Sequence, residues 1–249
     1  YDMRMKDIRV SHLEGTILNA DVGDSTKGRI KSLFNMMYKY AVAHDIVDKD
    51  YASVMFANGN PIKRERTKEP VPFTDEEVQQ LWNSKDMIPF ADMVLIGIYS
   101  GWRPQELSIL QIADIDLESG TMKGGLKTDA GKNRIVPIHP IIKPLIENRM
   151  KEADTLQSEY LFNDVNGQQG TYMTYDKYRQ RFQKVMDRLK MTHRPHETRH
   201  TFIKKAKSCN VNEHILKLIV GHSEKDITEK VYTHRTIDQL KTEIKKITK

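Results

Sequence analysis

The fold class is decided by residues 112–137, which read IADIDLESGTMKGGLKTDAGKNRIVP. Two short β-type pieces, residues 114–117 and 134–137, are separated by four glycines, a pattern typical of a small antiparallel sheet or hairpin. On both sides of this segment, apolar residues recur at the three- and four-residue spacing of helices. The sequence therefore predicts a mainly α fold with a small antiparallel β-sheet, of the α+β class.

Helical patterns flank the segment on both sides. Thr74 and Glu77 form a capping box, which predicts that a helix begins at Asp75. The predicted helices cover residues 75–84, 88–99, 104–111, 140–151, 174–190, 197–208, 212–220, 226–232 and 236–247. Together they predict one large body in which helices surround the small sheet.

The N-terminal part is a separate helical region in this interpretation. Residues 1–56 have helical spacing throughout, and the apolar stripe is strongest within residues 30–42. The basic side chains opposite that stripe fit either a solvated face or a helix that lies on DNA. Gly, Asn and Pro punctuate residues 57–72, whose centre, residues 63–68, is basic, so this stretch is predicted to be a linker between two bodies.

Composition limits the classes of function. The chain has 249 residues and a formal net charge of +6, which favours partners that carry phosphate. The single cysteine, Cys209, cannot form an internal disulfide, which fits a reducing compartment. No apolar run is long enough to span a membrane, and the first residues lack the apolar core of a signal peptide. Because position 1 is Tyr, we expect a piece of a longer protein.

Six residues are candidates for catalysis when they are considered together. They are Arg103 at a turn that opens a helix, Lys127 on the expected hairpin, His196 and Arg199 at a helix start, His222 after a glycine, and Tyr232. Each one alone has an ordinary explanation, such as an ion pair, a helix cap or a packing contact. Their combination favours phosphoryl transfer, because its transition state is stabilised by cations and donors placed in advance.

Each residue type has a specific use in such a reaction. The planar forks of the two arginines grip phosphate oxygens, and the two histidines donate or shuttle protons near neutral pH. Lys127 can protonate a leaving 5′ oxygen, and Tyr232 supplies an oxygen nucleophile. Protein cations that do this work leave no need for a metal.

Metal and nucleotide sites are weaker hypotheses. His193, His196 and His200 cluster in the sequence, but Arg199 between them would repel a zinc ion. The sequence contains no glycine-rich phosphate loop of the nucleotide-hydrolysing type. We therefore expect neither a metal nor a cofactor.

The order Arg, Lys, His-x-x-Arg, His, Tyr resembles the tyrosine recombinase (phage integrase) family. The strongest match is residues 195–202, PHETRHTF, followed by residues 220–223, VGHS, and 232–234, YTH. Residues 128–140 resemble the second β-strand of the family and its exit. Two positions depart from the pattern, since Trp102 precedes Arg103 where Leu or Met is more common, and Thr198 stands where Leu is common.

The resemblance implies a two-domain DNA clamp. Its parts are a partial helical core-binding domain (residues 1–58), a basic linker (59–72), a catalytic domain (73–234) and a C-terminal tail helix (235–249). It also implies that Glu106 is an acidic residue supporting the site. The tail has an apolar stripe that either folds back on its own domain or docks on a neighbouring protomer.

The activity implied by the resemblance is site-specific recombination of double-stranded DNA. Tyr232 would attack a phosphate, leaving a 3′-phosphotyrosine and a free 5′ hydroxyl, and four protomers would join two DNA sites through a Holliday junction. The chain as a whole resembles an integrase from a phage or conjugative element, and such an enzyme could act with directionality or bending factors. It would act in the cytoplasm of a bacterial or phage-infected host, at the nucleoid. The alternatives are a type IB topoisomerase and a non-catalytic DNA-binding accessory protein.

Overall fold

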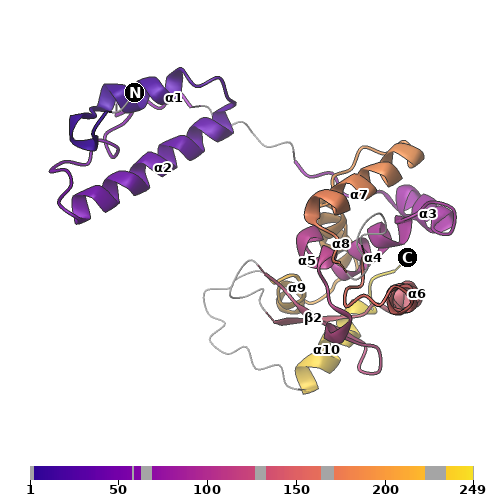
Figure 1. Cartoon of the computed structure of the whole chain (residues 1–249). Helices are drawn as coiled ribbons and strands as arrows, with labels where there is room; N and C mark the ends of the chain where they lie inside the picture. The colour runs from indigo at the N-terminus through magenta and orange to yellow at the C-terminus, as the bar shows by residue number, and fades with distance from the viewer. Residues whose placement is uncertain are drawn as a thin grey trace. The chain divides into compact units, whose positions relative to one another are not determined.

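The computed structural model describes residues 3–57, 59–62, 69–126, 133–163, 171–221 and 234–248. Contacts divide the chain into two compact units, Tyr1–Glu69 and Pro70–Lys249 (Figure 1). The predicted linker core, residues 63–68, and the predicted helix 226–232 lie outside the described residues. Among the helices that are described, none is both long and apolar enough to cross a membrane.

The first unit is built on two helices that pack against each other, α1 (Val10–Leu18) and α2 (Asp24–Ala43), after a short 3-10 turn, η1 (Met5–Asp7). Its core is a small cluster that comprises Leu13, Ile17, Tyr38, Ala41, Val47, Ala52 and Met55. The helical prediction for residues 1–56 is confirmed for α1 and α2, which end at Ala43. It is wrong beyond that point, because Asp45 adopts a left-handed φ of 54° and the N–H of Ile46 returns to Ala41 O, which ends the helix.

The second unit contains most of the predicted helices. They are α3 (Asp75–Ser84), α4 (Ala91–Ser100), α5 (Pro104–Ser108), α6 (Lys143–Thr155), α7 (Tyr175–Leu189), α8 (Glu197–Ser208), α9 (Glu213–Val220) and α10 (His234–Ile244), with 3-10 turns η2 (Ile112–Asp114) and η3 (Pro140–Ile142). α5 ends three residues earlier than predicted. The chain leaves the helix there to pair with residues 159–161, through Leu161 N to Leu110 O and Ile112 N to Glu159 O.

The predicted sheet is present and has three antiparallel strands. β1 (Ile115–Asp116), β2 (Thr121–Gly124) and β3 (Arg134–Pro137) lie in the order β1-β2-β3, with Met122 opposite both Ile115 and Val136. The middle strand was not expected, because β2 has a single large apolar side chain. That side chain, Met122, is buried while the next, Lys123, is exposed. A single change from a buried to an exposed residue is therefore enough to orient this strand in the sheet.

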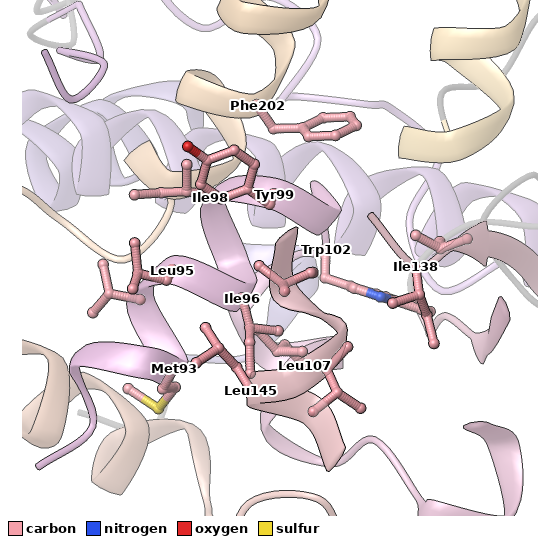
Figure 2. Packing of buried hydrophobic residues seen from close by; sticks show 14 of the residues in the cluster. Met93, Leu95, Ile96, Ile98, Tyr99, Trp102, Leu107, Ile138, Leu145 and Phe202 are labelled. Atoms are coloured by element: carbon pink, nitrogen blue, oxygen red, sulfur yellow. The ribbon is translucent and has the colours of Figure 1, made fainter. Parts of the chain in front are cut away.

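The core of the second unit is organised around α4. Every residue of this helix except Asp92 is buried, which is the pattern of a helix surrounded on nearly all sides by other elements. α4 packs most extensively on α8, and also on α3, α6 and α7. Figure 2 shows Ile96 and Ile98 of α4 among side chains from other elements, including Leu107, Ile138 and Leu145. The central helix therefore sets the position of α8 and of the turn that follows α4.

The C-terminal helix α10 folds back on its own unit. It packs on β3 and α9, and Leu240, Ile244 and Ile247 are buried. His139 Nδ1 accepts from Ile141 N, so its Nε2 donates to Ile247 O at 2.9 Å. In the single chain the apolar stripe of the tail is thus covered internally, which is the fold-back alternative.

The turn after α4 depends on one glycine. Gly101 has a φ of 67°, and a Cβ atom there would lie 2.4 Å from Phe202 Cδ1, in the core. We expect Gly101→Ala to lower the free energy of unfolding by about 3 kcal/mol or more, from backbone strain and overpacking together.

Gly120→Ala is the matched control. Gly120 has a φ of 66° but no atom within 4 Å of the added Cβ, so only backbone strain of about 1–2 kcal/mol is expected. Urea unfolding of both variants measures the difference. Equal losses would show that the contact with Phe202 contributes nothing.

Candidate active site

Arg103 and Arg199 reach the same helix end from different elements. Arg103 is the N-cap of α5, directly after the Gly101 turn, and Arg199 lies in the first turn of α8. Arg199 donates to Gly101 O at 2.8 Å and to Val220 O at 2.6 Å. Arg103 donates to Gly221 O at 3.2 Å. The two arginines, which are far apart in the sequence, therefore meet at the C-terminal end of α9.

Glu106 is a buried carboxylate that pairs with two arginines of this cluster. Its side chain is 2% exposed and accepts from Arg103 Nη1 at 3.0 Å and from Arg134 Nη2 at 2.7 Å. The backbone N–H of Leu126 donates to the same carboxylate at 3.2 Å. Burial alone would raise the pKa of Glu106, but the hydrogen bonds and charges of its partners, Arg134 first, outweigh burial and lower it. The carboxylate therefore stays ionised and fixes both arginines.

Arg134 is a member of this cluster that sequence reasoning did not identify. Its guanidinium is fully buried, donates to Ile219 O at 3.0 Å and lies 4.1 Å from the centroid of the Trp102 ring. The alternation of strand residues could have indicated it. Arg134 and Val136 share one face of β3, and Val136 is a core residue, so Arg134 must also point inward.

The cluster has an excess of positive charge. Three guanidinium groups and one carboxylate leave a balance of +2 at neutral pH. Burial, and then the neighbouring charges of Arg103 and Arg134, lower the pKa of Arg199 to about 9, against the opposite influence of Glu106. A bound anion would offset this repulsion, so the site is suited to a phosphate group.

His196 lies at the start of α8, one turn before Arg199. It is the exposed N-cap residue of the helix, and its ring centroid is 5.7 Å from that of His200. Lys127, His222 and Tyr232 lie outside the described residues. Of the six candidates, the structure thus brings Arg103 and Arg199 together and places His196 at the start of the same helix as Arg199.

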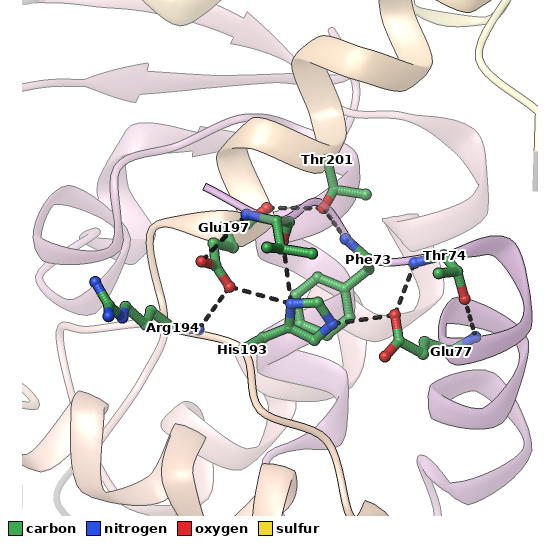
Figure 3. Close-up of polar contacts among 8 residues, drawn as sticks. Phe73, Thr74, Glu77, His193, Arg194, Glu197 and Thr201 are labelled. Carbon is green, nitrogen blue, oxygen red and sulfur yellow. Dashed lines mark hydrogen bonds and ion pairs between the residues drawn. The ribbon is translucent and has the colours of Figure 1, made fainter. Parts of the chain in front are cut away.

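The turn before α8 is fixed by a polar network around His193, shown in Figure 3. Its Nε2 lies 3.0 Å from Glu77, and its Nδ1 lies 3.1 Å from both Glu197 and Val71 O. The ring stacks on Phe73 at 3.7 Å. These contacts connect the start of the unit to α8 and occupy both nitrogens of His193. Within the described ranges, no group of three or more His, Cys, Asp or Glu residues could hold a metal ion.

Residues 72–238 match the model of the phage integrase family. The chain belongs to this family. Tyrosine recombinase XerA of Pyrococcus furiosus is 30% identical over 184 residues, which are 71% of this chain and 62% of that protein. The chain spans about three fifths of the length of such curated relatives.

Solved structures of the family share the fold. The integrase of transposon Tn1549, in complex with circular intermediate DNA, superposes with a TM-score of 0.71 at 20% identity, covering 96% of this chain and 85% of that one. A lambda integrase tetramer bound to a Holliday junction gives a TM-score of 0.64 at 14% identity, covering 92% and 68%. The mainly α fold with a small antiparallel sheet is therefore confirmed.

The charge on Glu106 is expected to be essential for stability. Glu106→Gln removes the carboxylate charge that pairs with the buried Arg134, which should lower the free energy of unfolding by about 3 kcal/mol. The pKa of Glu106 is lowered in the folded state. The stability that the ionised carboxylate contributes is therefore complete above its ordinary pKa and is lost as the pH falls through its pKa in the folded protein. The difference between wild type and variant should therefore shrink below about pH 4.3.

Glu152→Gln is the comparison for this measurement. Glu152 also pairs with an arginine, Arg149, at 2.6 Å, but its side chain is 42% exposed, so a loss of about 1 kcal/mol or less is expected. Chemical denaturation of the wild type and both variants at pH 7 and at pH 3.5 gives the loss of unfolding free energy for each variant at each pH. A loss for Glu106→Gln no larger than that for Glu152→Gln would contradict the role of the buried pair.

Proposed function

We propose that this chain is the core of a tyrosine-type site-specific DNA recombinase. The observation that carries the proposal is the convergence of Arg103 and Arg199 on one helix end, in a cluster with a positive balance that favours a phosphate group. Family membership supports it. So does the sequence order of the remaining candidates, Lys127, His196, His222 and Tyr232.

In this proposal the chain's own side chains carry the reaction. Tyr232 attacks a DNA phosphate and forms a 3′-phosphotyrosine, while the bond to the 5′ oxygen breaks and Lys127 delivers a proton to that oxygen. Arg103 and Arg199 bind the non-bridging oxygens, on which negative charge develops. The two histidines, 196 and 222, donate hydrogen bonds or carry protons. Attack by a 5′ hydroxyl from another strand reverses the step, so the bond energy is retained.

The finer assignment is an integrase of a phage or conjugative element. Support comes from the fold shared with the Tn1549 integrase bound to circular intermediate DNA and with a lambda integrase tetramer on a Holliday junction. We accordingly propose that four protomers act on two duplex sites in a bacterial or phage-infected host. The proposed domains are the partial core-binding domain 1–58, the linker 59–72, the catalytic domain 73–234 and the tail helix 235–249.

The nucleophile is the first part to test. A duplex selected by binding from a random-sequence pool, then nicked so that cleavage is trapped, should form a covalent adduct with the wild-type chain on a denaturing gel. Tyr232→Phe removes one oxygen and should abolish the adduct while leaving binding of the duplex nearly unchanged. Tyr175→Phe is the control, because Tyr175 is also a tyrosine and is exposed. Normal adduct yield from Tyr232→Phe would refute the assignment.

Separate roles for the cations are a second test. Arg199→Ala should slow cleavage by roughly a hundredfold or more, because it removes stabilisation of developing charge. Lys127→Ala should slow it through the leaving group. A 5′-phosphorothiolate substrate has a leaving group that needs no proton, so it should rescue Lys127→Ala selectively. Equal rescue of both variants, measured in single-turnover assays, would argue against the division of roles.

A further inference from the structure

The end of α9 is bound by three arginines through three consecutive carbonyl groups. Ile219 O accepts from Arg134, Val220 O from Arg199, and Gly221 O from Arg103. The carbonyls at a helix C-terminus lack partners within the helix and carry partial negative charge, so they are natural acceptors for guanidinium groups. Directly after Gly221 the chain continues into residues 222–233, which include His222 and Tyr232.

Arg134 differs from the other two arginines in its partners. Its side chain has 0% exposure, while that of Arg103 has 15%; Arg199 is also buried, with 3% of the residue exposed. Arg134 also connects two parts of the cluster, because it donates from Nε to α9 and from Nη2 to Glu106, which in turn holds Arg103. The Trp102 ring covers its guanidinium. The guanidinium of Arg134 therefore contacts the carboxylate that holds Arg103 and the helix end that accepts from Arg199.

We propose that Arg134 is a positioning residue for the recombination reaction, and that it sets the spacing between Arg103 and the end of α9. The inference rests on the proposed function and adds a seventh residue to the six candidates. Arg134 fixes Glu106, and thereby the direction of the Arg103 fork. It also fixes the helix end from which the segment with His222 and Tyr232 begins.

The geometry explains why an arginine stands at this position. Two separate N–H groups of one planar fork serve Ile219 O and Glu106 together, whereas a lysine ammonium lacks the fork and would serve one partner well. The same planar group stacks on Trp102. The departure from the family pattern at Trp102 thus coincides with a contact on Arg134.

The test uses the full chain and the selected, nicked duplex described above. Arg134→Met should slow single-turnover cleavage at saturating duplex on the order of a hundredfold, since a misplacement of about 1 Å can have that effect. The apparent affinity for the duplex should stay within about threefold. Arg134→Lys should give an intermediate rate. Hydrogen exchange of residues 213–221 should become at least about tenfold faster in Arg134→Met.

Arg149→Met is the matched control. Arg149 is also poorly exposed, at 12%, pairs with Asp92 and Glu152, and lies over Phe90; none of these three residues belongs to α9. It should lose thermal stability to a similar extent and keep both the wild-type cleavage rate and the wild-type exchange of residues 213–221. A merely structural role for Arg134 predicts that the two variants behave alike.

Two results would overturn the proposal. One is a wild-type cleavage rate, or unchanged exchange of residues 213–221, in folded Arg134→Met. The other is an equal fall in rate for Arg149→Met. If Arg134→Met fails to fold, Arg134→Lys takes its place under the same criteria. Absence of any adduct with the wild-type chain would refute the proposed function instead, and the exchange measurement would still decide whether Arg134 fixes the helix end.

Discussion

The structure of the site depends on one shared carboxylate. Glu106 is almost fully buried and stands between Arg103 and Arg134, so the cluster can hold three arginines without three unpaired charges. The remaining imbalance falls on Arg199, whose pKa is about 9. In the proposed function, this poorly compensated charge is available to a phosphate. A cluster of this kind gives up some stability and gains complementarity to an anion.

Packing in the core places this cluster. The largely buried helix α4 fixes α8, and the turn at Gly101 brings the chain so close to Phe202 that no side chain fits between them. Gly101 also supplies the carbonyl that receives Arg199. One tight turn thus sets both the approach of two helices and the direction of a functional side chain.

The bounds of several helices were predictable from the sequence, for physical reasons. The helices with strong apolar spacing and a clear start, such as α3 with its Thr74 capping box and α8, begin and end where expected. α5 and β2 were harder, because pairing with residues 159–161 and a single buried Met122 decided their extent. Such contacts are tertiary and leave no periodic pattern.

For the candidate site, the sequence order indicated Arg103, His196 and Arg199 as candidates, but it did not indicate the contacts that connect the arginines. Arg134 was not indicated, because a charged residue in a short strand normally faces solvent, and its burial depends on Trp102, Glu106 and α9 at once. The convergence on three consecutive carbonyls arises from three elements distant in sequence.

The fold-back of α10 has a consequence for the segment between α9 and α10. Residues 222–233 are joined to α9 at one end and to α10 at the other, and both helices are packed on the same unit. The two points at which this twelve-residue segment is attached are therefore held by the packing of α9 and α10 on one unit. If Tyr232 is the nucleophile, as proposed, the length of this segment and not diffusion sets the effective concentration of the nucleophile at the phosphate. Inserting or deleting residues in the segment would then act like diluting or concentrating a reactant.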